Sequence, residues 1–163
     1  MRLAVRLCIT PFKPTEERNL PSDDEALQEM FKALTTGLQF TSDSRLGRPL
    51  GTYDRPHPKR AENWRSNRSA RNVALSLQSL QQLSSHLSAI DTHPNANLVA
   101  SFDRALAQLE TLNDPTFAGV AQPQTRLKIE VLKQSIDTIR DLVRDALGPM
   151  LGVSAGFNAL DGD

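Results

Sequence analysis

The chain has 163 residues, of which 39% are hydrophobic and 23% charged, values that are typical of one globular domain with a real core. Its 19 basic residues balance 19 acidic residues and aromatic residues make up 5%, so neither a general basic excess nor a base-stacking platform supports nucleic-acid binding. The single cysteine, Cys8, excludes an internal disulfide and a cysteine-based zinc site.

The first 21 residues show little helical or strand pattern, because Pro11, Pro14 and Pro21 interrupt them. Arg6 breaks their apolar run, and we therefore predict no cleavable signal peptide. No run of about 18 apolar residues occurs, which predicts no transmembrane segment. We expect a poorly structured N-terminal segment and a helical domain over residues 22–163.

A first helix is predicted from Ser22, because Ser22 and Glu25 form the pattern of a capping box. Apolar residues then recur every three or four positions up to about Phe40. From Ser42 to Arg60, glycines and prolines predict a long connecting loop, and such loops are often functional. Several polar and aromatic residues favour a functional loop here: Arg45, Arg48, Tyr53, Asp54, Arg55 and His57.

Three more amphipathic helices follow. The second is predicted to begin between Lys59 and Glu62 and to run to about Ala89. The third covers about Leu98–Leu112, and the fourth covers about Gln122–Leu147.

The dipeptide Gly148-Pro149 should end the fourth helix, whose core stripe is expected to include Leu127 and Val131. No alternation typical of strands occurs anywhere. Four amphipathic helices with short links between the last three predict an all-α, up-and-down four-helix bundle. Its long loop precedes the second helix, and its C-terminal tail is expected to dock on the bundle.

The most unusual stretch is residues 61–72, which holds the only tryptophan and three arginines within seven residues. Read as a helix, it aligns Arg65, Ser69 and Asn72 on one strip. Cations in a first turn oppose the positive end of the helix macrodipole, so carboxylates or an anionic ligand should meet them. We favour a buried polar network here, and the alternative is a solvated basic face.

A second unusual stretch, residues 151–163, is apolar and rich in glycine and ends in Asp161 and Asp163. Its charges complement the arginine cluster, so we predict that the tail folds back and places one of these carboxylates near Arg65 or Arg68. An anion-binding site is the alternative, formed by Arg65, Arg68, Ser66 and Ser69.

Three segments resemble, in order, the C-terminal half of imelysin-family proteins. They are TGLQF and LGRPLG within residues 36–51, ENWRSNRS at residues 62–69, and GVSAGFNALDGD at residues 152–163. The resemblance covers about residues 23–163. It implies an exported protein of the periplasm or outer membrane, built from two helical-bundle halves with a site in the cleft between them. Iron or another divalent metal, and a metallopeptidase activity, are implied for the family.

The chain departs from this family in one respect. A Gly-x-His-x-x-Glu motif, linked to metal binding or peptidase chemistry in the family, does not occur here. None of the three histidines, His57, His86 and His93, has an acidic residue three or four positions later. We therefore assign no catalytic, cofactor or metal residue to this chain, and leave its cofactor unknown.

Three functions remain open on these grounds. We favour a non-catalytic binding domain linked to iron or metal uptake. The alternatives are a part of a metallopeptidase whose motif lies in a missing N-terminal half, and a structural half-domain that pairs with an N-terminal half or with itself. No nucleic-acid partner is expected. The candidate site is the cluster that carries the family resemblance: Glu62, Trp64, Arg65, Ser66, Arg68, Ser69, Asn158, Asp161 and Asp163.

Overall fold

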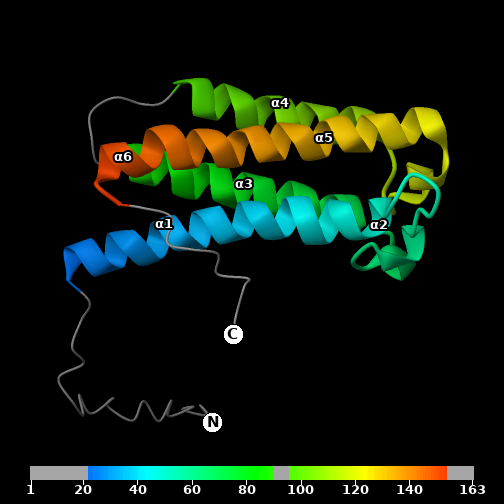
Figure 1. Cartoon of the computed structure of the whole chain (residues 1–163), viewed down its shortest axis with the longest axis horizontal. Coiled ribbons are helices and arrows are strands. Elements are labelled where there is room, and N and C mark those ends of the chain that lie inside the picture. The colour runs from blue at the N-terminus through cyan, green and yellow to red at the C-terminus, as the bar shows by residue number, and fades with distance from the viewer. Residues whose placement is uncertain (1–21, 90–95, 154–163) are drawn as a thin grey trace, which may run out of the picture.

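The computed structural model describes residues 22–89 and 96–153, and within these ranges the chain forms a bundle of four long helices (Figure 1). Neighbouring helices run in opposite directions, with α1 packed on α3 and α5, and α4 packed on the same two helices. The predicted all-α, up-and-down four-helix bundle is confirmed. The long helices are α1 (Asp23–Gln39), α3 (Ser69–Ser88), α4 (Ala96–Leu112) and α5 (Pro123–Leu142).

The core lies along the axis of the bundle and receives side chains from all four helices. Phe31 and Phe102 are its largest helical members and are fully buried. Leu127 and Val131, expected in the core, are instead 60% and 40% exposed on α5. The amphipathic pattern therefore identified the helices correctly but overestimated the width of the buried face of α5.

The start of α1 is capped as predicted. The Ser22 hydroxyl accepts a hydrogen bond from the Glu25 backbone N–H at 3.2 Å. The Glu25 carboxylate accepts one from the Ser22 N–H at 2.9 Å, which completes the capping box. Both contacts are local, so this boundary could be predicted from four residues of sequence.

The regular α-helix α1 ends at Gln39, close to the predicted end near Phe40, but the loop predicted from Ser42 is wrong as far as Leu50. The helix continues through a π-helical segment, η1 (Phe40–Gly47), and a final α-turn, α2 (Arg48–Leu50). Pro49 explains the π segment, because proline donates no N–H and its ring would collide with the carbonyl of Arg45 in a regular α-helix. A wider π-turn avoids that collision and preserves the helix direction.

The predicted end of the fourth helix at Gly148-Pro149 is wrong for the same reason. Here α5 continues through a π segment, η5 (Val143–Leu147), into the short helix α6 (Gly148–Leu151). The Gly148 N–H donates to the Val143 carbonyl five residues earlier, as a π-turn requires. Gly152, at φ 67°, then ends α6.

The second long helix begins at Ser69, later than the predicted start between Lys59 and Glu62. Before it, the chain forms two 3₁₀ turns, η2 (Pro58–Arg60) and η3 (Trp64–Ser66). Asn63 and Asn67 flank η3, and both have φ 55°, a left-handed conformation that asparagine tolerates and that interrupts a right-handed helix. Arg65 therefore does not share a helical strip with the residues of α3.

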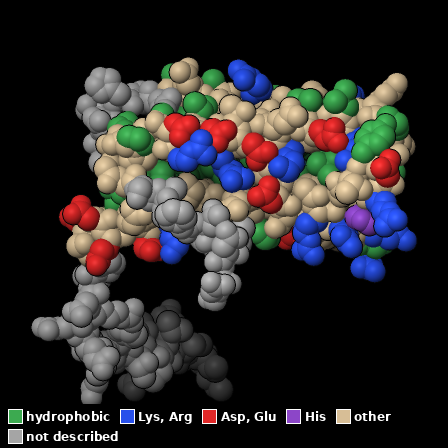
Figure 2. All heavy atoms as spheres, viewed as in Figure 1, with side chains coloured by type: hydrophobic (Ala, Val, Ile, Leu, Met, Phe, Trp, Pro, Cys, Tyr) green, Lys and Arg blue, Asp and Glu red, His purple; other side chains and the backbone are tan. Residues whose placement is uncertain are grey.

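The two ends of the bundle differ in charge. Figure 2 shows acidic side chains at the start of α1, and lysine and arginine side chains gathered at the opposite end, where α2 lies. No described helix is long and apolar enough to cross a membrane. The predictions for residues 1–21 and for Asn158, Asp161 and Asp163 fall outside the described residues, so the domain boundary at residue 22 stays a prediction.

Candidate functional site: the Arg45 groove

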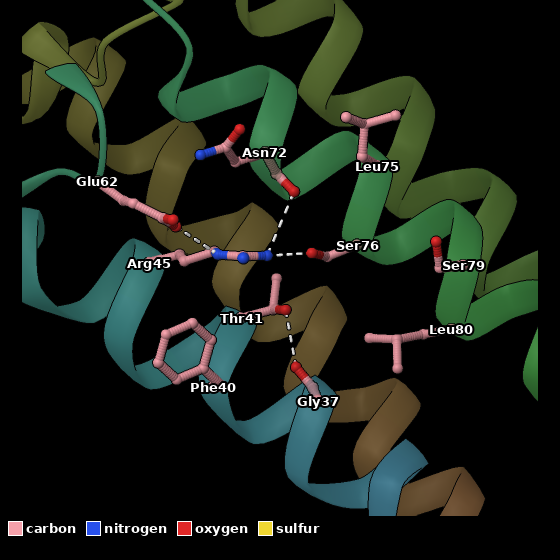
Figure 3. A pocket seen from close by; sticks show the side chains of 10 residues that line it. All are labelled: Gly37, Phe40, Thr41, Arg45, Glu62, Asn72, Leu75, Ser76, Ser79 and Leu80. Carbon is pink, nitrogen blue, oxygen red and sulfur yellow. Dashed lines mark hydrogen bonds and ion pairs between the residues drawn. The ribbon is translucent and has the colours of Figure 1, made fainter. Parts of the chain in front are cut away.

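A groove of about 490 Å³ lies between the end of the first helix and α3 (Figure 3). It is open to solvent on one side, and we call it the Arg45 groove. Its wall combines charged, hydroxyl and apolar side chains. The residues that define it are Phe40, Arg45, Glu62, Asn72, Leu75 and Ser76.

Arg45 is held by three partners from two parts of the chain (Figure 3). Its Nε donates to the Glu62 carboxylate at 2.7 Å. Its Nη1 donates to the Asn72 carbonyl at 3.3 Å and also to the Ser76 hydroxyl. The Arg45 side chain is only 19% exposed, against 42% for Glu62. Charge-assisted hydrogen bonds of this kind fix a guanidinium in one orientation.

The apolar side of the groove also contacts Arg45. Its guanidinium carbon lies 5.2 Å from the centre of the Phe40 ring, which is a cation–π distance. Across the groove, α1 and α3 approach closely at Gly37, where an added Cβ would lie 2.6 Å from a methyl carbon of Leu80. Close helix packing therefore sets the floor of the groove.

The π segment η1 positions Arg45, and a charged network fastens η1 to α5 on its other side. The Ser42 hydroxyl donates to the Asp137 carboxylate at 2.6 Å. Lys133 lies 2.9 Å from Asp137 and 3.4 Å from Asp43, and Arg140 lies 3.5 Å from Asp43. Because α3 holds one side of η1 and α5 the other, Arg45 has little freedom to move.

The cluster predicted from sequence is divided between two surfaces. Glu62 reaches the Arg45 groove, and the buried Ser69 hydroxyl donates to the Glu62 backbone carbonyl at 2.6 Å, which fixes the loop beside the groove. Arg65, Ser66 and Arg68 are exposed on the loop instead. The expectation of a buried polar network around these three is therefore wrong.

Trp64 is half-buried and contacts two cations. The Arg65 guanidinium lies 4.6 Å from its ring centre, and the Lys59 ammonium lies 5.9 Å from it. The Ser66 hydroxyl donates to the Asn63 carbonyl at 3.1 Å, a bond within its own turn. Among the described residues, no carboxylate forms an ion pair with Arg65 or Arg68.

The predicted pairing of the tail with these arginines involves residues outside the described ranges and stays a prediction. The last described residue, Val153, lies beside Gly148, which packs against Phe31 of α1.

Sequence reasoning placed Arg45 in a loop and so missed its role. A signal was present: Leu38, Ser42, Leu46 and Leu50, all buried, recur every four residues through the supposed loop. This spacing is slightly longer than the α-helical period and is what an underwound helix requires. The loop was predicted nevertheless, because Gly47 and Pro49 are residues that commonly interrupt helices.

The described part of the chain offers no cluster of three or more histidine, cysteine or acidic side chains suited to a metal ion. His86 is exposed on α3, and the backbone N–H of His57 donates to the Pro49 carbonyl at 2.8 Å. In the Arg45 groove, Glu62 supplies the one carboxylate. Iron and divalent metals take several oxygen or nitrogen ligands, so this set of donors does not fit a bare metal ion.

Comparison with known proteins gives one result. The family model described as imelysin, a peptidase family, matches residues 8–143, most of the chain. No curated protein matches the chain, and no solved structure does.

Proposed function

This chain belongs to the imelysin family, and from that premise we propose that it is a non-catalytic binding domain of an exported protein, linked to metal uptake, with the Arg45 groove as its ligand site. The observation that supports this proposal is the arrangement of Arg45. Its guanidinium is fixed by Glu62, Asn72 and Ser76 at the wall of an open groove. A preorganised cation of this kind loses little entropy when a ligand binds.

The side chains of the groove favour an organic ligand with carboxylate groups. Arg45 and Ser76 can donate to carboxylate oxygens, because the second terminal nitrogen of Arg45 has no hydrogen bond to a described residue. Phe40 and Leu75 add an apolar wall and are 42% and 50% exposed. Small-molecule sites commonly combine apolar walls with a few convergent polar groups.

A metal would reach this groove inside such a ligand rather than as a bare ion. Glu62 alone cannot complete the coordination shell of iron, and its carboxylate is already paired with Arg45. A carboxylate chelate brings its own donors and presents outward-facing oxygens to a guanidinium. A ferric complex of a small polycarboxylate is therefore the ligand class that connects the groove to metal uptake.

Calorimetric titration with ferric citrate tests the proposal. We expect saturable binding that Arg45→Gln weakens by about 10- to 100-fold, the range expected for lost charge-assisted hydrogen bonds. The matched control is Arg48→Gln, which removes an equal charge from an exposed side chain nearby. Unchanged binding in Arg45→Gln, or equally tight binding of bare zinc, calcium or ferrous ions, would contradict the proposal.

Family membership favours a second candidate function, a part of a metallopeptidase. In that case the motif histidine and glutamate would lie outside this chain, and the chain would supply one wall of a shared cleft. Hydrolysis of an unstructured peptide by the purified chain with added zinc separates the two functions. We expect no hydrolysis above the zinc-only background, and chelator-sensitive hydrolysis would instead support the peptidase.

The exposed apolar residues of α5 suggest where a partner binds if the chain is one half of a larger assembly. Leu127 and Val131 lie one helical turn apart and are 60% and 40% exposed. Their proposed partner is an N-terminal half-domain of the family or a second copy of this chain. Sedimentation velocity of the chain alone distinguishes these partners, because a dimer forms without another protein only if the partner is a second copy. The double variant Leu127→Lys with Val131→Lys should abolish such a dimer.

The proposed localisation is the periplasm or the outer membrane, and it rests on family membership. Fractionation of cells that express the full-length gene product tests it, with an antibody raised against this chain. Recovery in the cytoplasmic fraction alone would contradict it.

A further inference from the structure

We propose that the end of the bundle around α2 and the loop at residues 51–68 binds the surface of a bilayer that contains anionic lipids. We call this surface the basic end, and it is distinct from the Arg45 groove. Its cations gather on one end of the molecule in Figure 2. They are Arg48, Arg55, Lys59, Arg60, Arg65, Arg68 and Arg71, and all are exposed.

The basic end is strongly asymmetric in a chain with no net charge. Residues 48–71 contain these seven cations and two acidic residues, Asp54 and Glu62. Glu62 is already paired with Arg45, which lies outside the set. The opposite end of the bundle begins with the acidic first turn of α1. The molecule therefore carries a charge dipole along its long axis, which orients it toward an anionic surface.

Within the described residues, the cations of the basic end are not held in ion pairs, although Asp103 and Glu110 line the same surface pocket as Arg71. None of the seven cations forms an ion pair with a described carboxylate.

Aromatic side chains accompany the cations. Tyr53 is 71% exposed, and Trp64 is contacted by both Lys59 and Arg65. Tyrosine and tryptophan are enriched at the level of lipid headgroups, where their amphipathic rings are stable, and basic side chains add attraction to anionic lipids.

The secondary structure of the basic end favours a membrane over a nucleic acid. Five of the seven cations lie in the loop at residues 51–68, whose turns η2 and η3 have three residues each, so the loop offers no long helix or strand ribbon that could enter a duplex groove. Short turns with exposed side chains instead present many cations to a flat surface at once. A bilayer that contains anionic phospholipid is such a surface.

Vesicle co-sedimentation tests this proposal with the full chain. We expect binding to vesicles of phosphatidylcholine mixed with phosphatidylglycerol, no binding to phosphatidylcholine alone, and release at high salt, because surface charges are screened. Failure to bind the mixed vesicles at low salt would overturn the proposal.

Two variants with the same net charge locate the surface. The test variant is Arg55→Gln, Arg60→Gln and Arg68→Gln, whose side chains form no hydrogen bond, ion pair or cation–π contact with a described residue. The control variant is Lys32→Gln, Arg104→Gln and Arg144→Gln, three exposed cations of α1, α4 and η5 that lie outside the basic end.

Each cation near an anionic bilayer contributes about a fivefold factor, so the test variant should bind on the order of 100-fold more weakly. The control variant should lose far less. Equal loss in both variants would overturn the proposal, because it would indicate attraction without a defined surface. Tighter binding of single-stranded DNA than of the mixed vesicles, lost in the test variant alone, would assign the basic end to nucleic acid instead.

Discussion

The helix that ends at Leu50 (the first end) and the helix that ends at Leu151 (the second end) have similar termini. Residues distant in the sequence hold the first end, whereas hydrogen bonds within its own turn hold the second. In both, an α-helix widens into a π segment, a proline follows, and a glycine with positive φ ends the helix. At the first end, the Pro49 carbonyl accepts from the His57 N–H and the Leu50 carbonyl accepts from Arg126. At the second, Gly148 and Pro149 accept from the two residues that follow α6.

The difference shows what a π segment contributes in each place. At the second end, the hydrogen bonds form a Schellman motif, which is a local way to complete a helix. At the first end, η1 is clamped between α3 and α5, and the loop folds back onto its terminus. The first end therefore builds the wall of the Arg45 groove.

The largest expected effect is that of Gly51→Ala. Gly51 has φ 54° and ψ −145°, a conformation that is almost restricted to glycine, and an added Cβ would collide with the Arg55 carbonyl. We expect a loss of about 3 kcal/mol in the free energy of unfolding, measured by urea denaturation. A loss below about 0.5 kcal/mol would mean that the loop does not hold this end.

Arg126→Met should cost about 2 kcal/mol, because the buried Leu50 carbonyl loses its partner at 2.7 Å. Arg126 also lies 2.7 Å from Glu130 and stacks near the Tyr53 ring. Arg126→Lys retains the charge and should recover part of the loss in the same urea experiment. Equal stability of Arg126→Met and the natural chain would show that the contact to Leu50 is dispensable.

Gly152→Ala matches the Gly51 substitution at the second end and should cost only about 1 kcal/mol. Gly152 has φ 67° and ψ 17°, in the left-handed helical region, and an added Cβ would meet no atom within 4 Å. Thermal or urea unfolding of both alanine variants side by side gives the comparison. A cost as large as that of Gly51→Ala would contradict the distinction between the two ends.

The smallest effect concerns Arg144 and Asp145 in η5. A hydrogen bond from Arg144 lowers the pKa of the Asp145 carboxyl, although both side chains are exposed. Because the folded-state pKa is lowered, the pair contributes to stability above the ordinary carboxyl pKa and loses its contribution as pH falls through the lowered value. Arg144→Gln should raise the pKa of Asp145, as followed by carboxyl NMR, and lower urea stability at neutral pH by too little to measure, because solvent screens this exposed pair.

The predictions from sequence succeeded where a structure depends on neighbours along the chain. The third helix was predicted at Leu98–Leu112 and is observed at Ala96–Leu112, and the capping box of α1 has both of its expected bonds. They failed at Pro49 and Pro149, because a proline ends a helix only if the preceding turn cannot widen. Widening a helical turn into a π-turn replaces regular α-helical hydrogen bonds. Whether packing against the neighbouring helices offsets that loss cannot be read from the local sequence.

The candidate site was only partly predictable. Glu62 and Ser69 were identified from the segment that resembles the family, and both lie beside the Arg45 groove. The contact between Arg45 and Ser76 could not be predicted from a single sequence. The two residues lie on different helices, and a contact between residues distant in the chain produces no periodic pattern. Asn63 and Asn67 moved the start of α3 and turned Arg65 and Arg68 outward.

By itself, the sequence determined the helical class, the approximate positions of four amphipathic helices, the cap at Ser22 and the family. Each of these follows from spacing or from contacts within one turn. Only the tertiary structure decided that the helix end at Pro49 and Gly51, and not the one at Pro149 and Gly152, forms the wall of the Arg45 groove. The carbonyls of Pro49 and Leu50 receive their hydrogen bonds from His57 and Arg126. Partners that far along the chain are brought together only by the packed bundle.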